Sequence, residues 1–246
     1  MRKFGLIGFP LSHSFSQKYF SDKFEKERIT DCAYENFSFS SIDALPALLA
    51  AEPNLVGLNV TIPYKQQVIP FLDNSNEVVK EIAACNCIHI RHGKLFGFNT
   101  DVFGFEYSLK KNLKPYHHKA LILGTGGASK AVAYVLKKEG IDYKFVSRDP
   151  VAGSDRHIAY EQVISSILDD HHIIINTTPA GMFPNVNQCP PLPYQLLTSS
   201  HFLFDLIYNP AKTLFLQKGE EQGAAIQNGS DMLVIQAEES WKIWNS

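Results

Sequence analysis

Residues 119–140 read KALILGTGGASKAVAYVLKKEG, and this stretch decides the fold of the chain. The apolar run KALIL is typical of a buried strand, and the residues after the glycines have the apolar spacing of a helix that ends at Gly140. Gly124 permits a tight turn, and Gly126 lets the backbone approach a pyrophosphate, which can rest on the free N–H groups that begin the helix. The third position of this fingerprint holds Ser129 instead of Gly or Ala. The stretch therefore predicts a strand–turn–helix unit that binds a dinucleotide.

The next predicted strand, YKFVSRD at residues 143–149, indicates which dinucleotide is bound. A unit for NAD carries an acidic residue there, which holds the ribose 2′-hydroxyl. Here Arg148 stands at the strand end, and its planar guanidinium suits a 2′-phosphate and the face of the adenine. Asp149 would repel that phosphate unless its carboxylate turns away, and a solvated arginine is the alternative interpretation of Arg148. We predict NADP(H) as the cofactor.

Strands and helices alternate along the chain, which predicts an α/β fold with two domains. Strand-like runs occupy residues 3–10, 32–39, 55–63, 172–182 and 202–210, and helix-like runs occupy residues 16–29, 41–50 and 231–244. We predict an N-terminal α/β substrate domain of residues 1–101 plus 231–246 and a Rossmann-like dinucleotide-binding domain of residues 102–230. The amphipathic C-terminal helix would return to the first domain.

Composition and charge exclude several classes of protein. The 246 residues carry a formal net charge of −2 without a basic or acidic block, which argues against nucleic acid or an anionic membrane as the main partner. We expect no transmembrane helix, because no run of about 18 apolar residues occurs, and the first residues lack the apolar run of a signal peptide. Cys85 and Cys87 are too close for a CxxC zinc pair. We expect free thiols, no metal site and a cytoplasmic protein.

Polar side chains follow several predicted strands, where ligands bind in open α/β sheets. The segment NVTIPYK, residues 59–65, places Lys65 two residues after the strand stops at Pro63, where packing rarely calls for a lysine. Other polar residues near strand ends are Ser14, Ser16, Asn59, Thr61, Asn86, Asn99, Thr100 and Asp101. Together these short side chains would suit a small polyhydroxylated acid. Taken singly, the two serines also suit a turn or cap, Asn86 a left-handed residue, and Asp101 a helix N-cap.

Eight segments carry a resemblance to a known family. They are GFPLSHSFS (8–16), NVTIPYK (59–65), CNCI (85–88), GFNTD (97–101), GTGGASKA (124–131), NTTPAGM (176–182), DLIYNP (205–210) and NGSDMLVIQAEESW (228–241). They occur in the order found in shikimate dehydrogenases, and the chain resembles that family over essentially its whole length. NVTIPYK and GFNTD are the most specific segments, because ordinary Rossmann proteins lack them. The resemblance implies reversible, NADPH-linked reduction of 3-dehydroshikimate to shikimate, a step of chorismate and aromatic amino acid biosynthesis.

The resemblance also implies a role for each matching residue. Lys65 and Asp101 match the catalytic pair, in which the lysine exchanges a proton with the substrate oxygen; a structural lysine that reaches into solvent is the alternative for Lys65. Ser14 and Ser16 match residues that bind the substrate carboxylate. Ring hydroxyls would be held by Thr61, Lys65, Asn86, Asp101, Tyr208 and Gln236. Cofactor contacts would be made by Gly124, Thr125, Gly126, Gly127, Ala128, Ser147, Arg148, Leu206 and Gly229, and Glu77 matches a weaker contact.

Three departures from the family pattern bear on these expectations. The usual Asn-Arg-Thr is Ser-Arg-Asp at residues 147–149. The usual DGLGML is NGSDML at residues 228–233, which puts the carboxylate of Asp231 near the expected nicotinamide end. The usual GAVNT is AACNC at residues 83–87. The alternatives are an NAD-using quinate/shikimate dehydrogenase and a cofactor-binding regulator without turnover. Quinate has an extra hydroxyl beside its carboxylate, so the serine pair favours shikimate, and the intact Lys65 and Asp101 argue against a regulator. The small-molecule partner is shikimate or 3-dehydroshikimate, and the sequence is compatible with a monomer or a homodimer.

Overall fold

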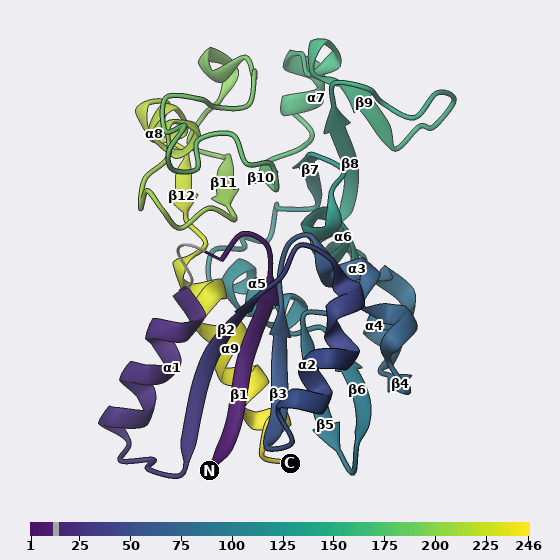
Figure 1. Ribbon diagram of the computed structural model, residues 1–246. Helices are drawn as coiled ribbons and strands as arrows, with labels where there is room; N and C mark the ends of the chain where they lie inside the picture. Colours follow the sequence, from purple (N-terminus) through teal and green to yellow (C-terminus); the bar gives the residue numbers. More distant parts are fainter. Residues whose placement is uncertain (12–14) are drawn as a thin grey trace. The chain divides into compact units, whose positions relative to one another are not determined.

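The computed structural model describes residues 1–11 and 15–246, so Ser14 lies outside the described residues. The chain folds into two compact units (Figure 1). The first unit comprises residues 1–100 and 237–246, and the second comprises residues 101–236. The C-terminal helix α9 (Ser230–Trp244) ends within the first unit, as the tail of the sequence predicted.

The first unit contains a six-stranded mixed sheet. Its strands are β1 (Arg2–Gly8), β2 (Cys32–Ser38), β3 (Leu55–Val60), β4 (Asn74–Ser75), β5 (Cys87–Arg91) and β6 (Lys94–Phe98), in the order β2-β1-β3-β5-β6-β4. β1 pairs in parallel with β2 and β3, whereas β5 pairs antiparallel with β3 and β6. The parallel pairing puts the carboxyl ends of β1 and β3 at one edge of the sheet, which is where the candidate site residues follow.

Helices cover both faces of this sheet. They are α1 (Phe15–Lys26), η1 (Ile42–Ala44), α2 (Leu45–Ala51), α3 (Tyr64–Gln67), η2 (Ile69–Phe71), α4 (Glu77–Ile82) and the end of α9. On one face, Phe4 packs with Phe20 of α1 and with Trp244 of α9. On the other, Leu58 of β3 lies in one apolar cluster with Leu45 of α2. Both faces of the central strands are therefore buried, and successive side chains alternate between them.

The second unit contains a six-stranded sheet in which every described pair is parallel. Its strands are β7 (Lys119–Leu123), β8 (Asp142–Ser147), β9 (His157–Ala159), β10 (Ile173–Asn176), β11 (Phe202–Asp205) and β12 (Ala225–Gln227), in the order β12-β11-β10-β7-β8-β9. The chain starts at β7 and builds outward on both sides of it, so β7 and β10 form the switch point beside which dinucleotides bind. The predicted Rossmann-like fold is confirmed.

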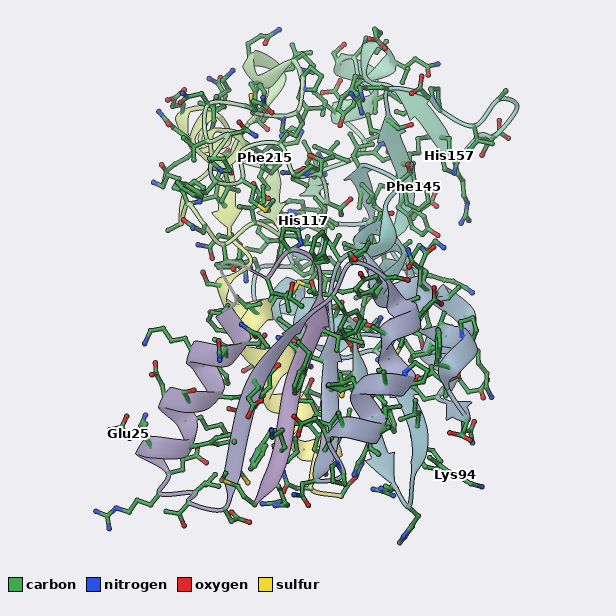
Figure 2. The ribbon with its side chains drawn as sticks, viewed as in Figure 1. Glu25, Lys94, His117, Phe145, His157 and Phe215 are labelled. Carbon is green, nitrogen blue, oxygen red and sulfur yellow. The ribbon has the colours of Figure 1, made fainter. Side chains whose placement is uncertain are left out.

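The helices of this unit are α5 (Asp101–Lys110), α6 (Gly127–Lys138), η3 (Tyr160–Gln162), α7 (Ser165–Leu168), η4 (Tyr194–Leu196), α8 (Leu214–Glu221) and the start of α9. Phe105 of α5 packs edge-on against Phe204 of β11, with ring centroids 5.2 Å apart. Residues 148–156 join the parallel strands β8 and β9 without a helix. At this edge the rings of Phe145 and His157 stack on each other, with centroids 4.9 Å apart (Figure 2).

Two further predictions concern the environment of the chain. Within the described residues, no helix is long and apolar enough to cross a membrane. Among the described residues the four cysteines form no disulfide, and Cys32, Cys85 and Cys87 are buried.

Candidate active site

In the first unit, Lys65 lies in the short helix α3, just beyond the carboxyl end of β3. The backbone N–H of Thr61 donates to the carbonyl oxygen of Ile7 at 2.9 Å, which holds the segment after β3 against the end of β1. The carbonyl oxygen of Lys65 accepts from the backbone N–H of Cys85 at 2.7 Å. Lys65 is therefore fixed next to the segment that carries Asn86, and its side chain is partly exposed.

Asn86 links this segment to the chain that leads to Asp101. Its Oδ1 accepts from the backbone N–H of Thr100 at 2.6 Å, and its Nδ2 donates to the Thr100 hydroxyl at 3.0 Å. Its own carbonyl accepts from the backbone N–H of Val60 at 2.9 Å. Asn86 is buried and does not have a positive φ, so the interpretation as a left-handed residue is wrong. Asp101 directly follows Thr100 and begins α5.

Asn59 has a structural role in the first unit. Its side chain is buried, and its Oδ1 accepts from the Tyr34 hydroxyl at 2.8 Å. Its Nδ2 donates to the Ser240 hydroxyl of α9 at 2.9 Å, and that hydroxyl lies 3.2 Å from the hydroxyl of Thr100. These bonds tie β3 to the C-terminal helix, and Ser240 is a residue that the sequence did not single out.

Two other predicted residues of the first unit have local partners. Ser16 is buried in the first turn of α1, and its hydroxyl bonds to that of Tyr34. Burial raises the pKa of Tyr34 well above its usual value, and the bond to Ser16 opposes that rise. Glu77 begins α4 and forms an exposed ion pair with Lys80 at 2.7 Å.

The glycine-rich turn of the second unit has the predicted strand–turn–helix geometry. Gly124 follows β7 with a φ of +99°, and a Cβ built there would lie 2.9 Å from Cγ2 of Thr178, so the turn requires glycine. A Cβ built at Gly126 or Gly127 would meet none of the described atoms within 4 Å. The N-terminus of α6 is therefore open at these two glycines, and its free N–H groups suit a pyrophosphate.

A cavity of about 620 Å³ opens beside this turn. Its lining comes from the turns after β7, β8 and β10, from Tyr160 and from the loop segments 182–185 and 188–191. In an open α/β sheet this end of the strands is where a dinucleotide binds. The volume and the place of the cavity fit such a ligand.

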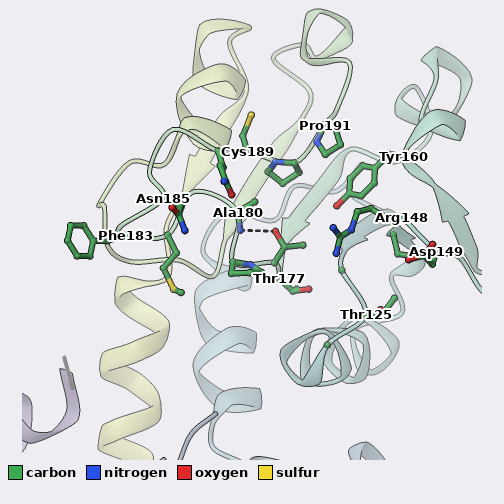
Figure 3. Close-up of a pocket in the computed structure, with 18 of the residues that line it drawn as sticks. Thr125, Arg148, Asp149, Tyr160, Thr177, Ala180, Phe183, Asn185, Cys189 and Pro191 are labelled. Atoms are coloured by element: carbon green, nitrogen blue, oxygen red, sulfur yellow. Dashed lines mark hydrogen bonds between the residues drawn. The ribbon is translucent and has the colours of Figure 1, made fainter. Parts of the chain in front are cut away.

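Three polar groups gather at one end of the cavity (Figure 3). The guanidinium of Arg148 extends into the cavity, whereas the carboxylate of Asp149 points away from it (Figure 3). Tyr160 directs its hydroxyl toward the guanidinium; burial raises the pKa of Tyr160, and the positive charge of Arg148 opposes that rise. The Ser147 hydroxyl is buried and lacks a hydrogen-bond partner among the described residues. Arg148 forms no ion pair with a described residue. Together with the Tyr160 phenol and the Ser147 hydroxyl, its guanidinium fits an adenosine that carries a 2′-phosphate.

The opposite wall of the cavity is connected to a buried carboxylate. Asp205 ends β11 and is fully buried. Burial raises the pKa of Asp205 to about 6, and hydrogen bonds from Thr213, Ile207 and Asn176 act in the opposite direction. Asn176 also binds Thr178, which lines the cavity.

Leu206, Tyr208 and Gly229 belong to the loops after β11 and β12. The backbone N–H of Leu206 donates to the carbonyl oxygen of Asn176 at 3.1 Å. A Cβ built at Gly229 would lie 2.1 Å from the carbonyl oxygen of Leu206, so only glycine permits this approach. Tyr208 is 39% exposed and so has surface left for a ligand.

Gln236 and Asp231 lie on α9. Gln236 is buried, and its Nε2 donates to the carbonyl oxygen of Leu233 at 2.9 Å. Asp231, the carboxylate that departs from the family pattern, forms an ion pair with Lys111 at 2.7 Å. Its negative charge is therefore offset within the second unit.

Comparisons with known proteins agree on one family. The family model of the shikimate dehydrogenase substrate binding domain matches residues 6–88. The chain is 36% identical over 258 residues to the shikimate dehydrogenase (NADP(+)) of Carboxydothermus hydrogenoformans, covering 98% of this chain and 90% of that protein. The crystal structure of shikimate dehydrogenase 1 from Peptoclostridium difficile is 37% identical with a TM-score of 0.83, covering 100% of this chain and 92% of that one. The shikimate 5-dehydrogenase of Thermus thermophilus, solved in complex with NADP(H) and shikimate, is 30% identical with a TM-score of 0.86, covering 99% and 93%.

Proposed function

The chain belongs to the shikimate dehydrogenase family and is an NADP-dependent oxidoreductase, and we propose that Lys65 and Asp101 form its catalytic pair. One observation carries the proposal. The Cys85 N–H binds the Lys65 carbonyl at 2.7 Å, and the adjacent Asn86 binds the Thr100 N–H at 2.6 Å. The residue that precedes Asp101 is thus held to the same short segment as Lys65.

The reaction is the reversible reduction of 3-dehydroshikimate to shikimate, for which the bound dinucleotide supplies the hydride. Lys65 gives a proton to the ketone oxygen as negative charge builds there, and its neutral amine takes that proton back in the reverse direction. While charged, the ammonium stabilises the developing oxyanion electrostatically. Asp101 orients the Lys65 ammonium and accepts a hydrogen bond from a ring hydroxyl.

The other polar residues recognise the substrate. Thr61 and Asn86 bind ring hydroxyls, and the Asn86 amide is held in place by its bonds to Thr100. Tyr208 and Gln236 match further residues that bind ring hydroxyls in the family. Ser14 and Ser16 bind the carboxylate.

The cofactor occupies the cavity of the second unit. The open N-terminus of α6 at Gly126 and Gly127 would hold its pyrophosphate, and Leu206 and Gly229 would make further contacts with the dinucleotide. Arg148 pairs with the 2′-phosphate, and Asp149 does not oppose this because its carboxylate points away (Figure 3). By function we assign residues 1–101 plus 231–246 to the substrate domain and residues 102–230 to the cofactor domain, whereas the compact units of the fold divide after residues 100 and 236.

We also place the protein in the cytoplasm, as a monomer or a homodimer. The cysteines, which form no disulfide among the described residues, support a reducing compartment, because thiols in oxidising compartments usually form disulfides.

The test is an assay of the purified protein with shikimate and with quinate, each with NADP and with NAD. We expect turnover with shikimate and NADP. Turnover that requires quinate would overturn the substrate assignment, and preference for NAD would overturn the role of Arg148. Absence of turnover with both acids would overturn the enzymatic assignment in favour of a cofactor-binding regulator.

A further inference from the structure

Asp205 is a charged residue in the interior of the second unit, and three donors surround its carboxylate. The Nδ2 of Asn176 (3.1 Å) and the backbone N–H of Ile207 (3.0 Å) donate to Oδ1. The hydroxyl of Thr213 donates to Oδ2 at 2.5 Å. No lysine or arginine within the described parts of the chain pairs with this carboxylate. A buried carboxylate is tolerated only where donors satisfy it, so these bonds fix their donors firmly.

The first donor connects Asp205 to the wall of the dinucleotide cavity. A carboxylate only accepts hydrogen bonds, so Asn176 must turn its Nδ2 toward Asp205 and its Oδ1 away. That Oδ1 accepts from the backbone N–H of Thr178 at 3.0 Å and from its hydroxyl at 2.7 Å. The Thr178 hydroxyl in turn accepts from the backbone N–H of Ala180 at 3.3 Å (Figure 3). The orientation of one amide therefore determines the course of residues 177–180, which line the cavity.

The second donor fixes the loop after β11. The bond from the Ile207 N–H to Asp205 turns the chain immediately after the strand. Leu206 is bound there to the carbonyl oxygen of Asn176. Leu206 and Tyr208, the two residues of this loop with proposed ligand contacts, flank Ile207 in the sequence. A single carboxylate thus holds two loops that follow neighbouring parallel strands.

We propose that Asp205 is a positioning residue for cofactor binding: its carboxylate sets the orientation of Asn176, which holds Thr178 in the shape that receives the dinucleotide. Asp205 does not line the cavity and acts through these neighbours. The inference rests on the proposed function in one respect, that this cavity receives the dinucleotide. It does not depend on which acid is the substrate.

The first test is Asp205→Asn, which keeps the size of the side chain but replaces one acceptor by an amide donor. The amide oxygen at position 205 is a weaker acceptor than a carboxylate for Asn176 and Ile207, and the new amide N–H meets the Thr213 hydroxyl, which must turn to accept it, so Asn176 is held less firmly. We expect the Kd for NADPH, measured by fluorescence titration without substrate, to rise roughly tenfold. At saturating cofactor, kcat should fall much less than cofactor affinity, because Lys65 and Asp101 are untouched.

Thr178→Val tests the other end of the same network. Valine keeps the shape of threonine and removes only the hydroxyl that bonds Asn176 and Ala180. We expect a rise in the Kd for NADPH of roughly threefold to tenfold. Because both changes break one chain of bonds, the double variant should bind NADPH no more weakly than Asp205→Asn alone. Thr178→Val leaves the buried carboxylate intact, so it keeps the test valid even if Asp205→Asn does not fold.

Asp142→Asn is the matched control, because Asp142 is an exposed carboxylate at the start of β8 in the same unit. It should leave the Kd for NADPH unchanged. A folded Asp205→Asn protein with wild-type affinity for NADPH would overturn the proposal, as would fully additive effects in the double variant. Titration needs no turnover, so a failure of the shikimate assay with these binding results intact would reject the proposed function alone.

Discussion

The indole ring of Trp244 occupies the space beside Gly57, where a Cβ at position 57 would lie 2.3 Å from the indole Nε1. The same Nε1 donates to the carbonyl oxygen of Ile88 at 2.9 Å, and the ring stacks on that of Phe4. The last turn of α9 is therefore held against the middle of the first sheet. This contact anchors the helix that carries Ser240, the partner of Asn59.

Gly57→Ala should destabilise the first unit by about 1–3 kcal/mol, because the added methyl group collides with a ring that is itself hydrogen-bonded. The free energy of unfolding, from denaturant titration followed by tryptophan fluorescence, measures the effect. Asn54→Ala is the control, because Asn54 is exposed just before the same strand. Equal stability of the two variants would show that the indole moves aside without cost.

Lys65→Ala should lower kcat by about 10²–10⁴-fold, since the ketone oxygen would lose its proton donor. The Kd for NADPH should stay within about twofold, because the cavity of the second unit is unchanged. Steady-state kinetics and fluorescence titration separate the two effects. Lys80→Ala, on the exposed surface of α4 in the same unit, should change neither. Nearly normal turnover in folded Lys65→Ala protein would remove Lys65 from the mechanism.

Arg148→Leu should raise the KM for NADP roughly 10–100-fold and change the KM for NAD much less, because only NADP carries the 2′-phosphate. Asp149→Asn should change the KM for NADP less than about threefold, since its carboxylate points away from the guanidinium (Figure 3). Arg156→Ala is the control, because Arg156 lies over the ring of Tyr143 and does not line the cavity. Equal losses with NADP and NAD in Arg148→Leu would mean that the arginine contacts a part common to both dinucleotides.

The sequence predicted several elements whose signals are local, although it missed the hairpin of β5 and β6. Residues 119–140 combine a buried strand, a glycine that needs a positive φ and an amphipathic helix, and all three appear as predicted. β9 was missed, because a strand of three residues owes its existence to pairing with β8, which no local pattern records. Tyr160 was missed with it, since it follows this strand directly.

The sequence predicted which residue types make up the candidate site, but not whether each side chain faces the core or the ligand. Asn59 and Thr61 stand two residues apart at the end of β3, yet Asn59 bonds into the core and Thr61 stays partly exposed. Both faces of this sheet are buried, so alternation of polar and apolar residues could not distinguish the core face from the ligand edge. The role of Asp205 depends on Asn176, 29 residues away in the sequence, and such pairings appear only in the folded chain.

Acid should destabilise the second unit, because three of its histidines are buried as neutral rings. Burial lowers the pKa of His117, His171 and His201 below the ordinary value of 6.5. His201 shows why: its Nδ1 accepts from the Thr198 N–H, and its Nε2 faces the carbonyl oxygen of Leu168, so a second ring proton would meet a donor. These histidines bind protons more readily when unfolded. Their contribution to stability is therefore complete above about pH 6.5 and is lost as the pH falls toward their folded values.

Asp205 affects the pH dependence of stability in the opposite direction from the histidines, so a variant at this position gives a second test of the pH prediction. Its pKa of about 6 in the folded protein exceeds the unfolded value of 3.8, so its contribution favours the folded state at low pH and is lost as the pH rises through about 6. Between pH 6 and 4.5 the free energy of unfolding should fall with pH in the wild type, and it should fall more steeply in Asp205→Asn, by up to about 1.4 kcal/mol per pH unit. Urea titrations at half-unit pH steps measure both slopes. Asp142→Asn should follow the wild-type slope, and an identical slope in Asp205→Asn would mean that the carboxylate stays ionised throughout this range.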